Sequence, residues 1–297
     1  MSEARIGVVG GSGLYEMAGL AIREERRVTT PWGDPSDAYI LGDLDGRSVA
    51  FLARHGRGHR LLPSELNFRA NIYGFKKLGV EFLISVSAVG SLKIEYVPGH
   101  IVIPDQFYDR TRHRADTFFG DGLVAHTSLA RPVSATLAGV LLEASKREGA
   151  TVHMGGTYVN MEGPQFSTRA ESFVYRHLGM DVIGMTNLQE AKLAREAEIA
   201  YASLSMITDY DCWHEEEAAV TGEGVMEVLR RNVELAQRVV RRAIGRLDES
   251  VANDCAEALA MSLITDPGLV PPATLDKLEP LIGKYLDRSG DRLVWKR

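Results

Sequence analysis

The stretch that most constrains the fold is residues 199–209, IAYASLSMITD, which is apolar or small almost throughout. A strand with one face in water alternates apolar and polar side chains, whereas this run suits a strand covered on both faces. Helices cover both faces of the sheet in α/β proteins. The segment is therefore predicted to be a central strand of a helix-covered sheet.

Strand and helix patterns alternate along the chain, which favours an α/β fold: a single domain with a mainly parallel or mixed central sheet flanked by helices. Two strands are expected on either side of Asp45-Gly46, a dipeptide typical of hairpin turns. Apolar spacing predicts helices over 64–79, with Ser64 as N-cap, and over 132–149, 168–179, 188–198 and 223–247. Residues 1–250 would form this domain, and a Pro-rich segment leads into a C-terminal helical appendage, 251–297.

The charge balance limits the partners of this chain. A formal net charge of -6 and a pI of about 5.8 argue against a nucleic-acid-binding surface. The two cysteines, Cys212 and Cys255, form no CxxC pair, and the sequence shows no secretion signal and no apolar run of membrane length. We expect a cytoplasmic enzyme that binds neither nucleic acid nor membrane.

The glycine-rich stretch GGSG, residues 10–13, follows a predicted strand. Backbone N–H groups of such a turn can converge on an anion, and Ser12 adds a hydroxyl donor. A plain tight turn is the alternative. A dinucleotide fingerprint is disfavoured because Glu16 stands where the third glycine would be.

A basic cluster, ARHGRGHR, occupies residues 53–60 of this otherwise acidic chain. Arg54 and His55 suit a phosphate, for which arginine offers paired donors. A solvated basic loop is the alternative. His55 and His59 have the spacing of two helical metal ligands, but the glycines between them disfavour a helix, so no metal site is predicted.

Polar residues also end two predicted strands. Ser87 and Ala88 close a buried run at VSAVGS, and Met185 and Thr186 close the run DVIGMT. Ligands of open α/β sheets bind at such strand ends. An anion and a sugar could bind there, although strand termini and core packing explain the same residues.

The stretch MEGPQFSTRAE contains an aromatic residue, Phe166, just before a predicted helix capped by Ser167 or Thr168. Phe166 could stack on a flat base, and ordinary core packing is its alternative. Glu162, at the start of this stretch, is a candidate to bind ribose hydroxyls.

Two carboxylates follow the central strand in TDYDCW, where strand periodicity places Asp209 and Asp211 on one face and Tyr210 on the other. Two acids forced together raise one pKa, so one can hold a proton at neutral pH. The protonated acid could then donate to a ring nitrogen while the ionised acid accepts from an amine. An acidic surface turn is the alternative.

Together these segments resemble the 5′-methylthioadenosine phosphorylases, in the trimeric branch of the purine nucleoside phosphorylase superfamily. The resemblance covers residues 5 to 245, in the family's order. It depends on GVVGGSGLY, TPWGDPSDAYILG, LARHGRGH, SAVGSL, PGHIVIPDQFYDRT, MEGPQFSTRAES and GMTNLQEAKLAREAEIAYASLSMITDYDCW. It implies the fold of the purine nucleoside phosphorylases.

The resemblance also implies roles for individual residues. Phosphate contacts would come from Ser12, Arg54, His55, Ser87, Ala88 and Thr186. Base contacts would come from Phe166, Ser167 and the catalytic pair Asp209 and Asp211, with Met185 packing on the ribose. A pocket for the 5′ group would use His59, Val225 and Met226, with His126 reaching in from the neighbouring subunit.

The implied reaction is attack of inorganic phosphate on 5′-methylthioadenosine, with phosphate as co-substrate and no cofactor or metal. The implied assembly is a homotrimer or a dimer of trimers. A phosphorylase acting on 6-oxopurine nucleosides or methylthioinosine is the alternative enzyme, and a non-catalytic nucleotide-binding protein is the alternative outside the enzymes.

Overall fold

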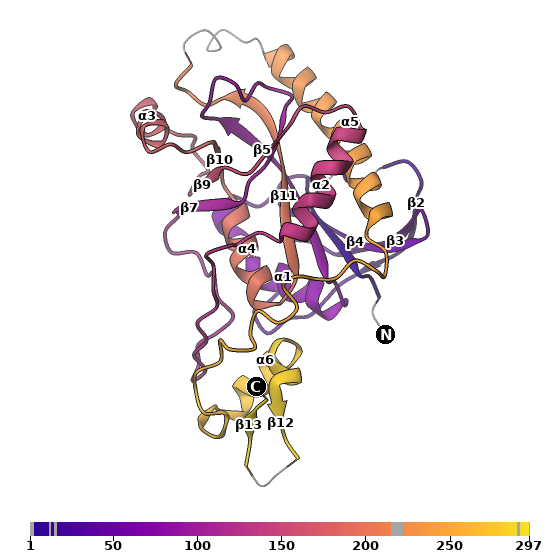
Figure 1. The fold of residues 1–297 in the computed structure, drawn as a ribbon, viewed down its shortest axis with the longest axis vertical. Helices are drawn as coiled ribbons and strands as arrows, with labels where there is room; N and C mark the ends of the chain where they lie inside the picture. The colour runs from indigo at the N-terminus through magenta and orange to yellow at the C-terminus, as the bar shows by residue number, and fades with distance from the viewer. Residues whose placement is uncertain (1–2, 12, 15–16, 215–221, 290–291, 297) are drawn as a thin grey trace.

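The predicted central strand, β11 (Ala200–Tyr210), runs through the middle of the molecule in the computed structural model (Figure 1). The structure describes residues 3–11, 13–14, 17–214, 222–289 and 292–296. β11 is buried from Ala200 to Ile207, with α4 (Asn187–Glu196) and two further helices, α2 (Ala135–Arg147) and α5 (Gly222–Arg246), packed against it. The prediction from residues 199–209 is confirmed.

The main sheet is mixed, as predicted, and has β5 (Phe82–Ser91) at its centre. β5 pairs in parallel with β11 along its length, and β11 also pairs with β6 (Ile101–Ile103) and through it with β8 (Val152–Met154). The remaining order is β2 (Leu20–Arg26), β3 (Tyr39–Leu44), β4 (Arg47–Ala53), β1 (Ile6–Gly10), β5, β10 (Val182–Gly184), β9 (Thr157–Met161), β7 (Gln106–Arg110).

The sheet splits along one side of β5. β1 pairs with β5 in parallel up to Ser85, whereas β10 pairs with it in the opposite direction at Gly90 and Ser91. Residues 86–89 of β5 therefore face an opening between β1 and β10. The carboxyl ends of β1 and β4 lead into this opening from one side and that of β10 from the other, which creates a crevice for a ligand.

Local signals explain most element boundaries. Asp45 and Gly46 both have positive φ, 51° and 78°, and join β3 to β4 as the hairpin prediction requires. The predicted N-cap at Ser64 is wrong, because Ser64 lies in a separate 3-10 turn, η2 (Pro63–Glu65). Asn67 caps α1 (Phe68–Lys77) instead and accepts a hydrogen bond from the Ala70 N–H at 3.2 Å.

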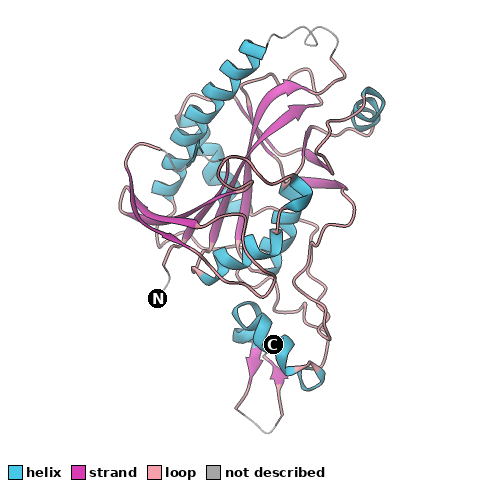
Figure 2. Cartoon of the chain, turned by 180° about the vertical axis from the view of Figure 1, so that it is seen from behind, coloured by secondary structure: helices cyan, strands magenta, loops and turns pink. Residues whose placement is uncertain are grey.

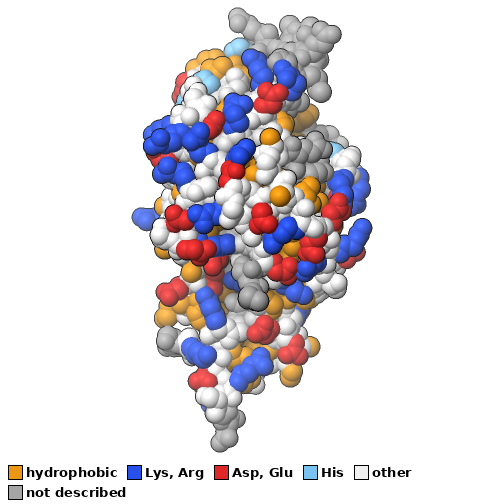
Figure 3. All heavy atoms as spheres, turned by 90° about the vertical axis from the view of Figure 1, so that its right-hand side faces the viewer, with side chains coloured by type: hydrophobic (Ala, Val, Ile, Leu, Met, Phe, Trp, Pro, Cys, Tyr) orange, Lys and Arg blue, Asp and Glu red, His pale blue; other side chains and the backbone are white. Residues whose placement is uncertain are grey.

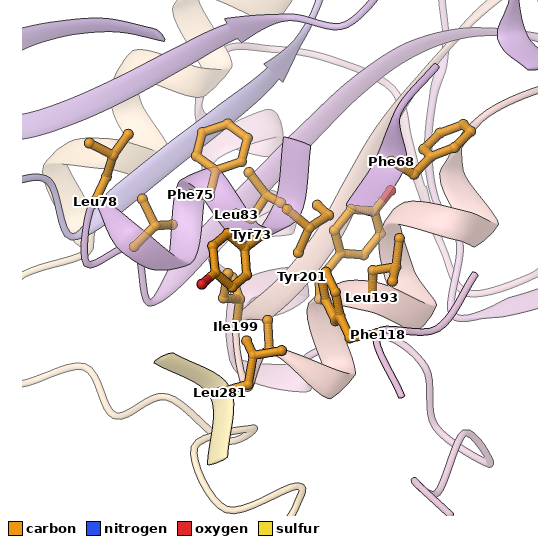
Figure 4. Close-up of a cluster of buried hydrophobic side chains, with 14 of the residues drawn as sticks. Phe68, Tyr73, Phe75, Leu78, Leu83, Phe118, Leu193, Ile199, Tyr201 and Leu281 are labelled. Atoms are coloured by element: carbon orange, nitrogen blue, oxygen red, sulfur yellow. The ribbon is translucent and has the colours of Figure 1, made fainter. Parts of the chain in front are cut away.

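The chain after residue 250 forms α6 (Pro272–Ile282) and a small hairpin of β12 (Leu286–Asp287) and β13 (Val294–Trp295) at one end of the molecule (Figure 2). α6 packs against α1, and Leu281 joins the core cluster near Tyr73 and Ile199 (Figure 4). Apolar residues of the tail thus extend the core of the body. The β12–β13 hairpin was not predicted from the sequence.

Buried Glu198 ties the tail to the body. One carboxylate oxygen accepts from the Tyr285 hydroxyl at 2.6 Å and from the Leu259 N–H at 3.0 Å, and the other forms an ion pair with Lys284 at 2.5 Å. We propose that residues 251–297 are an appendage that packs on the domain formed by residues 1–250.

The face in Figure 3 carries Lys and Arg interspersed with Asp and Glu, in keeping with the overall net charge of -6. Within the described residues, no helix combines the length and apolar character needed to cross a membrane.

Candidate active site

A cavity of about 590 Å³ opens at the split in the sheet. It collects predicted site residues from five separate segments of the chain. Its lining includes Arg54, His55, His59, Ser87, Ala88, Phe166, Met185, Thr186, Asp209 and Asp211.

The other predicted residues lie elsewhere or are not described. Ser12 lies outside the described residues, as do the side chains of Val225 and Met226 in α5. Ser167 is not in the cavity lining, and its hydroxyl contacts the Met161 sulfur at 3.8 Å. His126 lines a separate cavity of about 370 Å³, so within one chain it is not part of the site.

Arg54 is buried at one end of the cavity, in an ion pair that we did not predict. Its Nε donates to Glu190 Oε1 at 2.5 Å, and its Nη2 donates to Ser85 Oγ at 2.6 Å. Its Nη1 donates to the Val86 carbonyl at 2.9 Å. Burial opposes the charged guanidinium, but Glu190 outweighs this effect and the pKa of Arg54 is raised. Nη1 has two hydrogens, so one remains for a ligand as far as the described residues show.

His55 also lines the cavity. Its Nδ1 lies 2.8 Å from the Leu61 carbonyl, which can only accept, so Nδ1 holds the hydrogen. Its ring stacks on His59 at 4.3 Å. Burial lowers the pKa of His55 to about 4 despite the Leu61 hydrogen bond. The ring is therefore neutral near pH 7, and Nε2 can accept a hydrogen bond.

Hydroxyls complete this end of the cavity. The Ser87 Oγ is buried and has no hydrogen-bond partner among the described residues. Thr186 is buried at the N-cap position of α4, whose first turn points partial positive charge towards the cavity. An unpaired buried hydroxyl is costly unless a ligand satisfies it, so this end fits an oxyanion.

The two aspartates line the other end of the cavity, beside Gly90, which follows Ser87 along β5. A bulge in β11 between Ile207 and Asp209 changes the register just before them. Asp211 is buried, and its Oδ2 has no hydrogen-bond partner among the described residues. A Cβ added to Gly90 would lie 3.1 Å from Ile183 Cγ2, 3.2 Å from Asp209 Oδ1 and 3.4 Å from Asp211 Cβ, so both aspartates pack close to this glycine.

Tyr210 points away from the cavity, as strand periodicity predicts. Its ring stacks on His214 at 4.7 Å, and its hydroxyl donates to the Ile94 carbonyl at 2.9 Å. Among the described residues, no group of three or more His, Cys, Asp or Glu could hold a metal ion.

Phe166 stands at the edge of the cavity with 83% of its surface exposed, which is unusual for a large aromatic side chain. The core-packing alternative for Phe166 is therefore wrong. An exposed ring beside two carboxylates offers a stacking surface and polar partners for a flat heterocycle.

The prediction for Glu162 is wrong. Its carboxylate is outside the cavity lining and accepts from Ser64 Oγ, the Arg112 N–H and Arg114 Nε. Three donors therefore occupy the group that was expected to bind ribose. Arg114 and Glu190 are the residues that sequence reasoning missed. Each stands among other charged residues, in RTRHRAD and in QEAKLARE, so no local signal distinguishes it.

One cavity thus combines groups that suit an oxyanion with groups that suit a flat heterocycle, at a split in a mixed α/β sheet. A nucleoside phosphorylase needs this combination, because it brings a phosphate and a nucleoside together. The family model described as the phosphorylase superfamily matches residues 5–245 of this chain.

Curated relatives and solved structures narrow the family further. The S-methyl-5′-thioadenosine phosphorylase of Koribacter versatilis is 59% identical over 95% of this chain and 97% of that protein. Its counterpart in Chloroflexus aurantiacus is 58% identical over 96% and 99%. A methylthioadenosine phosphorylase from an antarctic soil metagenomic library superposes with a TM-score of 0.91 at 47% identity, over 95% and 99% of the two chains. The chain belongs to the S-methyl-5′-thioadenosine phosphorylase family.

The tail is shared with these relatives. The match to the Koribacter protein spans 283 residues, so at least 33 of them lie beyond residue 250. The segment after residue 250 is therefore an ordinary part of the protein in this family, although the superfamily model ends at residue 245.

Proposed function

We infer that this chain catalyses the phosphorolysis of 5′-methylthioadenosine, giving adenine and 5-methylthioribose 1-phosphate. The observation that carries this inference is the two-ended cavity: an unsatisfied Ser87 hydroxyl beside Arg54 at one end, and Asp209 and Asp211 beside exposed Phe166 at the other. A Schistosoma mansoni relative, 34% identical with a TM-score of 0.80 over 87% of this chain and 98% of that one, was solved as a mutant with methylthioadenosine bound.

Phosphate would bind where the hydroxyls and the helix N-terminus converge. Ser87, Thr186, the Ala88 N–H and the remaining Nη1 hydrogen of Arg54 supply donors, and Ser12 would add another. His55 Nε2 would accept the hydrogen of HPO₄²⁻. Because Glu190 balances Arg54, the site relies on directed donors and not on a large net positive charge.

The base would lie against Phe166, with Ser167 beside it and the ribose against Met185. As the glycosidic bond breaks, electrons move onto the purine ring and the sugar gains positive charge. A proton shared with one aspartate at N7 stabilises the leaving adenine, while the other aspartate accepts from the 6-amino group. Phosphate then bonds to the anomeric carbon. Catalysis comes from positioning and electrostatics, with no cofactor.

The 5′ group would face Leu62, Pro63 and His59, which line the same cavity. Val225, Met226 and the neighbouring subunit's copy of His126 would complete this pocket. We propose a homotrimer, alone or paired with a second trimer, whose heterologous interfaces close a ring. Light scattering at working concentration checks this, since the mass of a single 32.6 kDa chain would remove both the trimer and the His126 contact. We place the enzyme in the cytoplasm.

The test is a panel of methylthioadenosine, adenosine, inosine and methylthioinosine, each incubated with and without phosphate. Release of adenine from methylthioadenosine only when phosphate is present supports the inference. Equal turnover of inosine or methylthioinosine favours the 6-oxopurine alternative, and binding without turnover favours a non-catalytic protein.

A further inference from the structure

We propose that Arg114 is a positioning residue for this reaction, which holds three segments of the cavity wall together from behind. The proposal builds on the function inferred above. Arg114 is not in the cavity lining, and its side chain is only 3% exposed. It can affect substrate only through the residues that it holds.

All five N–H donors of the Arg114 guanidinium have an acceptor. Nε donates to Glu162 Oε1 at 2.9 Å. Nη1 donates to the Met185 carbonyl at 2.5 Å and to Gln189 Oε1 at 3.2 Å. Nη2 donates to the Glu162 carbonyl and to Ser64 Oγ at 3.3 Å. A saturated, planar donor set fixes its partners in both distance and direction.

These acceptors belong to three segments that shape the cavity. Met185 lines the cavity itself, next to Thr186 at the start of α4. Glu162 begins the turn that leads to Pro164 and Phe166, which line the base end. Ser64 lies in η2, directly after Leu62 and Pro63 on the wall near the 5′ group. One side chain therefore sets the relative positions of the sugar, base and 5′ contacts.

A second side chain, Asn160, donates to two of the acceptors that Arg114 uses. Asn160 Nδ2 also donates to the Met185 carbonyl, at 3.2 Å, and to Gln189 Oε1, at 3.3 Å. Gln189 in turn donates to Thr111 Oγ1 at 2.9 Å. The Met185 carbonyl thus accepts hydrogen bonds from two side chains, Arg114 and Asn160, and of these two donors Arg114 is the charged one.

Lysine cannot replace this arginine. An ammonium group has three donors in a tetrahedral arrangement, whereas the five acceptors around Arg114 match a planar fork. Reacting groups in an enzyme must keep their geometry, and a displacement of about 1 Å can cost on the order of 10²-fold in rate. Loss of Arg114 should therefore appear in kcat, not only in stability.

The experiment compares Arg114→Met and Arg114→Lys with Arg5→Met. Arg5 is a matched control, because it also joins distant segments through a carboxylate, Glu81, and two backbone carbonyls, those of Asp248 and Val251. For each purified protein, kcat, KM for methylthioadenosine, KM for phosphate and Tm are measured. Assays are run well below the lowest Tm.

Both Arg114 variants should lose about 10–100-fold in kcat, with a raised KM for methylthioadenosine, while Arg5→Met loses Tm alone. Kinetics of Arg114→Met equal to wild type in a folded protein would overturn the proposal, as would full recovery by Arg114→Lys.

Glu162→Gln serves if the Arg114 variants do not fold, because it weakens the same contacts without removing the arginine. A reduced kcat supports the proposal, and wild-type kcat and KM overturn it. The wild-type enzyme is assayed in parallel: if it does not cleave methylthioadenosine, the proposed function fails, which is a different result from equal activity of wild type and variants.

Discussion

Replacing Glu190 by glutamine should destabilise the protein strongly and make its stability depend on phosphate. The side chains of Arg54 and Glu190 are 4% and 3% exposed, so neither charge is compensated by water. Glu190 Oε2 also accepts from Ser85 Oγ at 2.8 Å and from the Tyr201 hydroxyl at 3.0 Å. Glutamine has the same shape, but it removes the negative charge. Its NH₂ group is a hydrogen-bond donor, and it would face the donors of Arg54, Ser85 and Tyr201.

The magnitude follows from the burial of the pair. Breaking a buried ion pair by neutralising one partner costs about 3–5 kcal/mol, mostly because the other charge stays buried and unpaired. The shift is roughly 2–4 °C per kcal/mol for domains of about 150–250 residues, and the lower value suits this chain of 297 residues, so Tm should fall by on the order of 6–10 °C. Removing both charges in Arg54→Met/Glu190→Leu leaves no unpaired ion and should restore much of this loss.

Phosphate provides the second measurement. In Glu190→Gln the guanidinium of Arg54 lacks its counter-ion, so a bound phosphate takes over part of that role. Tm is measured by calorimetry with increasing phosphate, and with potassium chloride at equal ionic strength as control. Phosphate should raise the Tm of Glu190→Gln more than that of wild type, and should have little effect on the double variant.

Two outcomes contradict this reasoning. A Tm for Glu190→Gln equal to wild type would mean that Arg54 does not depend on this carboxylate. Equal phosphate-induced shifts in Glu190→Gln and in Arg54→Met/Glu190→Leu would mean that phosphate does not bind beside Arg54. Arg54→Ala adds a kinetic check: its phosphate KM should rise at least ~10-fold, as expected for loss of a charge-assisted hydrogen bond.

Further predictions concern the base, the pH response and the tail. Asp209→Asn supplies an amide donor for O6, so it should lose activity on methylthioadenosine and gain relative activity on inosine, measured as the ratio of the two kcat/KM values. The pKa of His55 is lowered from 6.5 to about 4 by burial, so its contribution to stability is complete above pH 6.5 and falls as the pH drops towards 4. Between pH 6.5 and pH 4, the Tm of His55→Gln should therefore decline less than the Tm of the wild type. Leu281→Ala should cost about 2–5 kcal/mol in urea unfolding, because it opens a cavity in the core of Figure 4. An unchanged unfolding midpoint would show that the tail is not part of that core.

Local patterns were sufficient for much of the fold. The apolar run at 199–209 predicts the buried part of β11, and Asp45-Gly46 predicts a hairpin, because burial and turn geometry depend on adjacent residues. The alternation in TDYDCW predicts the directions of the aspartates and of Tyr210 for the same reason. Ser64 failed as an N-cap because Pro63 and Asn67 offered a turn and a better cap nearby.

Residue types and their order in the chain therefore indicated which groups could bind phosphate and which could bind a purine. They also predicted that these groups lie at the ends of strands. The partners of those groups were settled only by tertiary packing. Glu190 lies 136 positions from Arg54, and Glu162 lies 48 positions from Arg114. No local pattern links such pairs, because they come together only when the sheet splits at β5 and α4 packs against it. The physical reason is that a buried charge must find its counter-charge wherever the fold places one, and that location is a property of the folded chain.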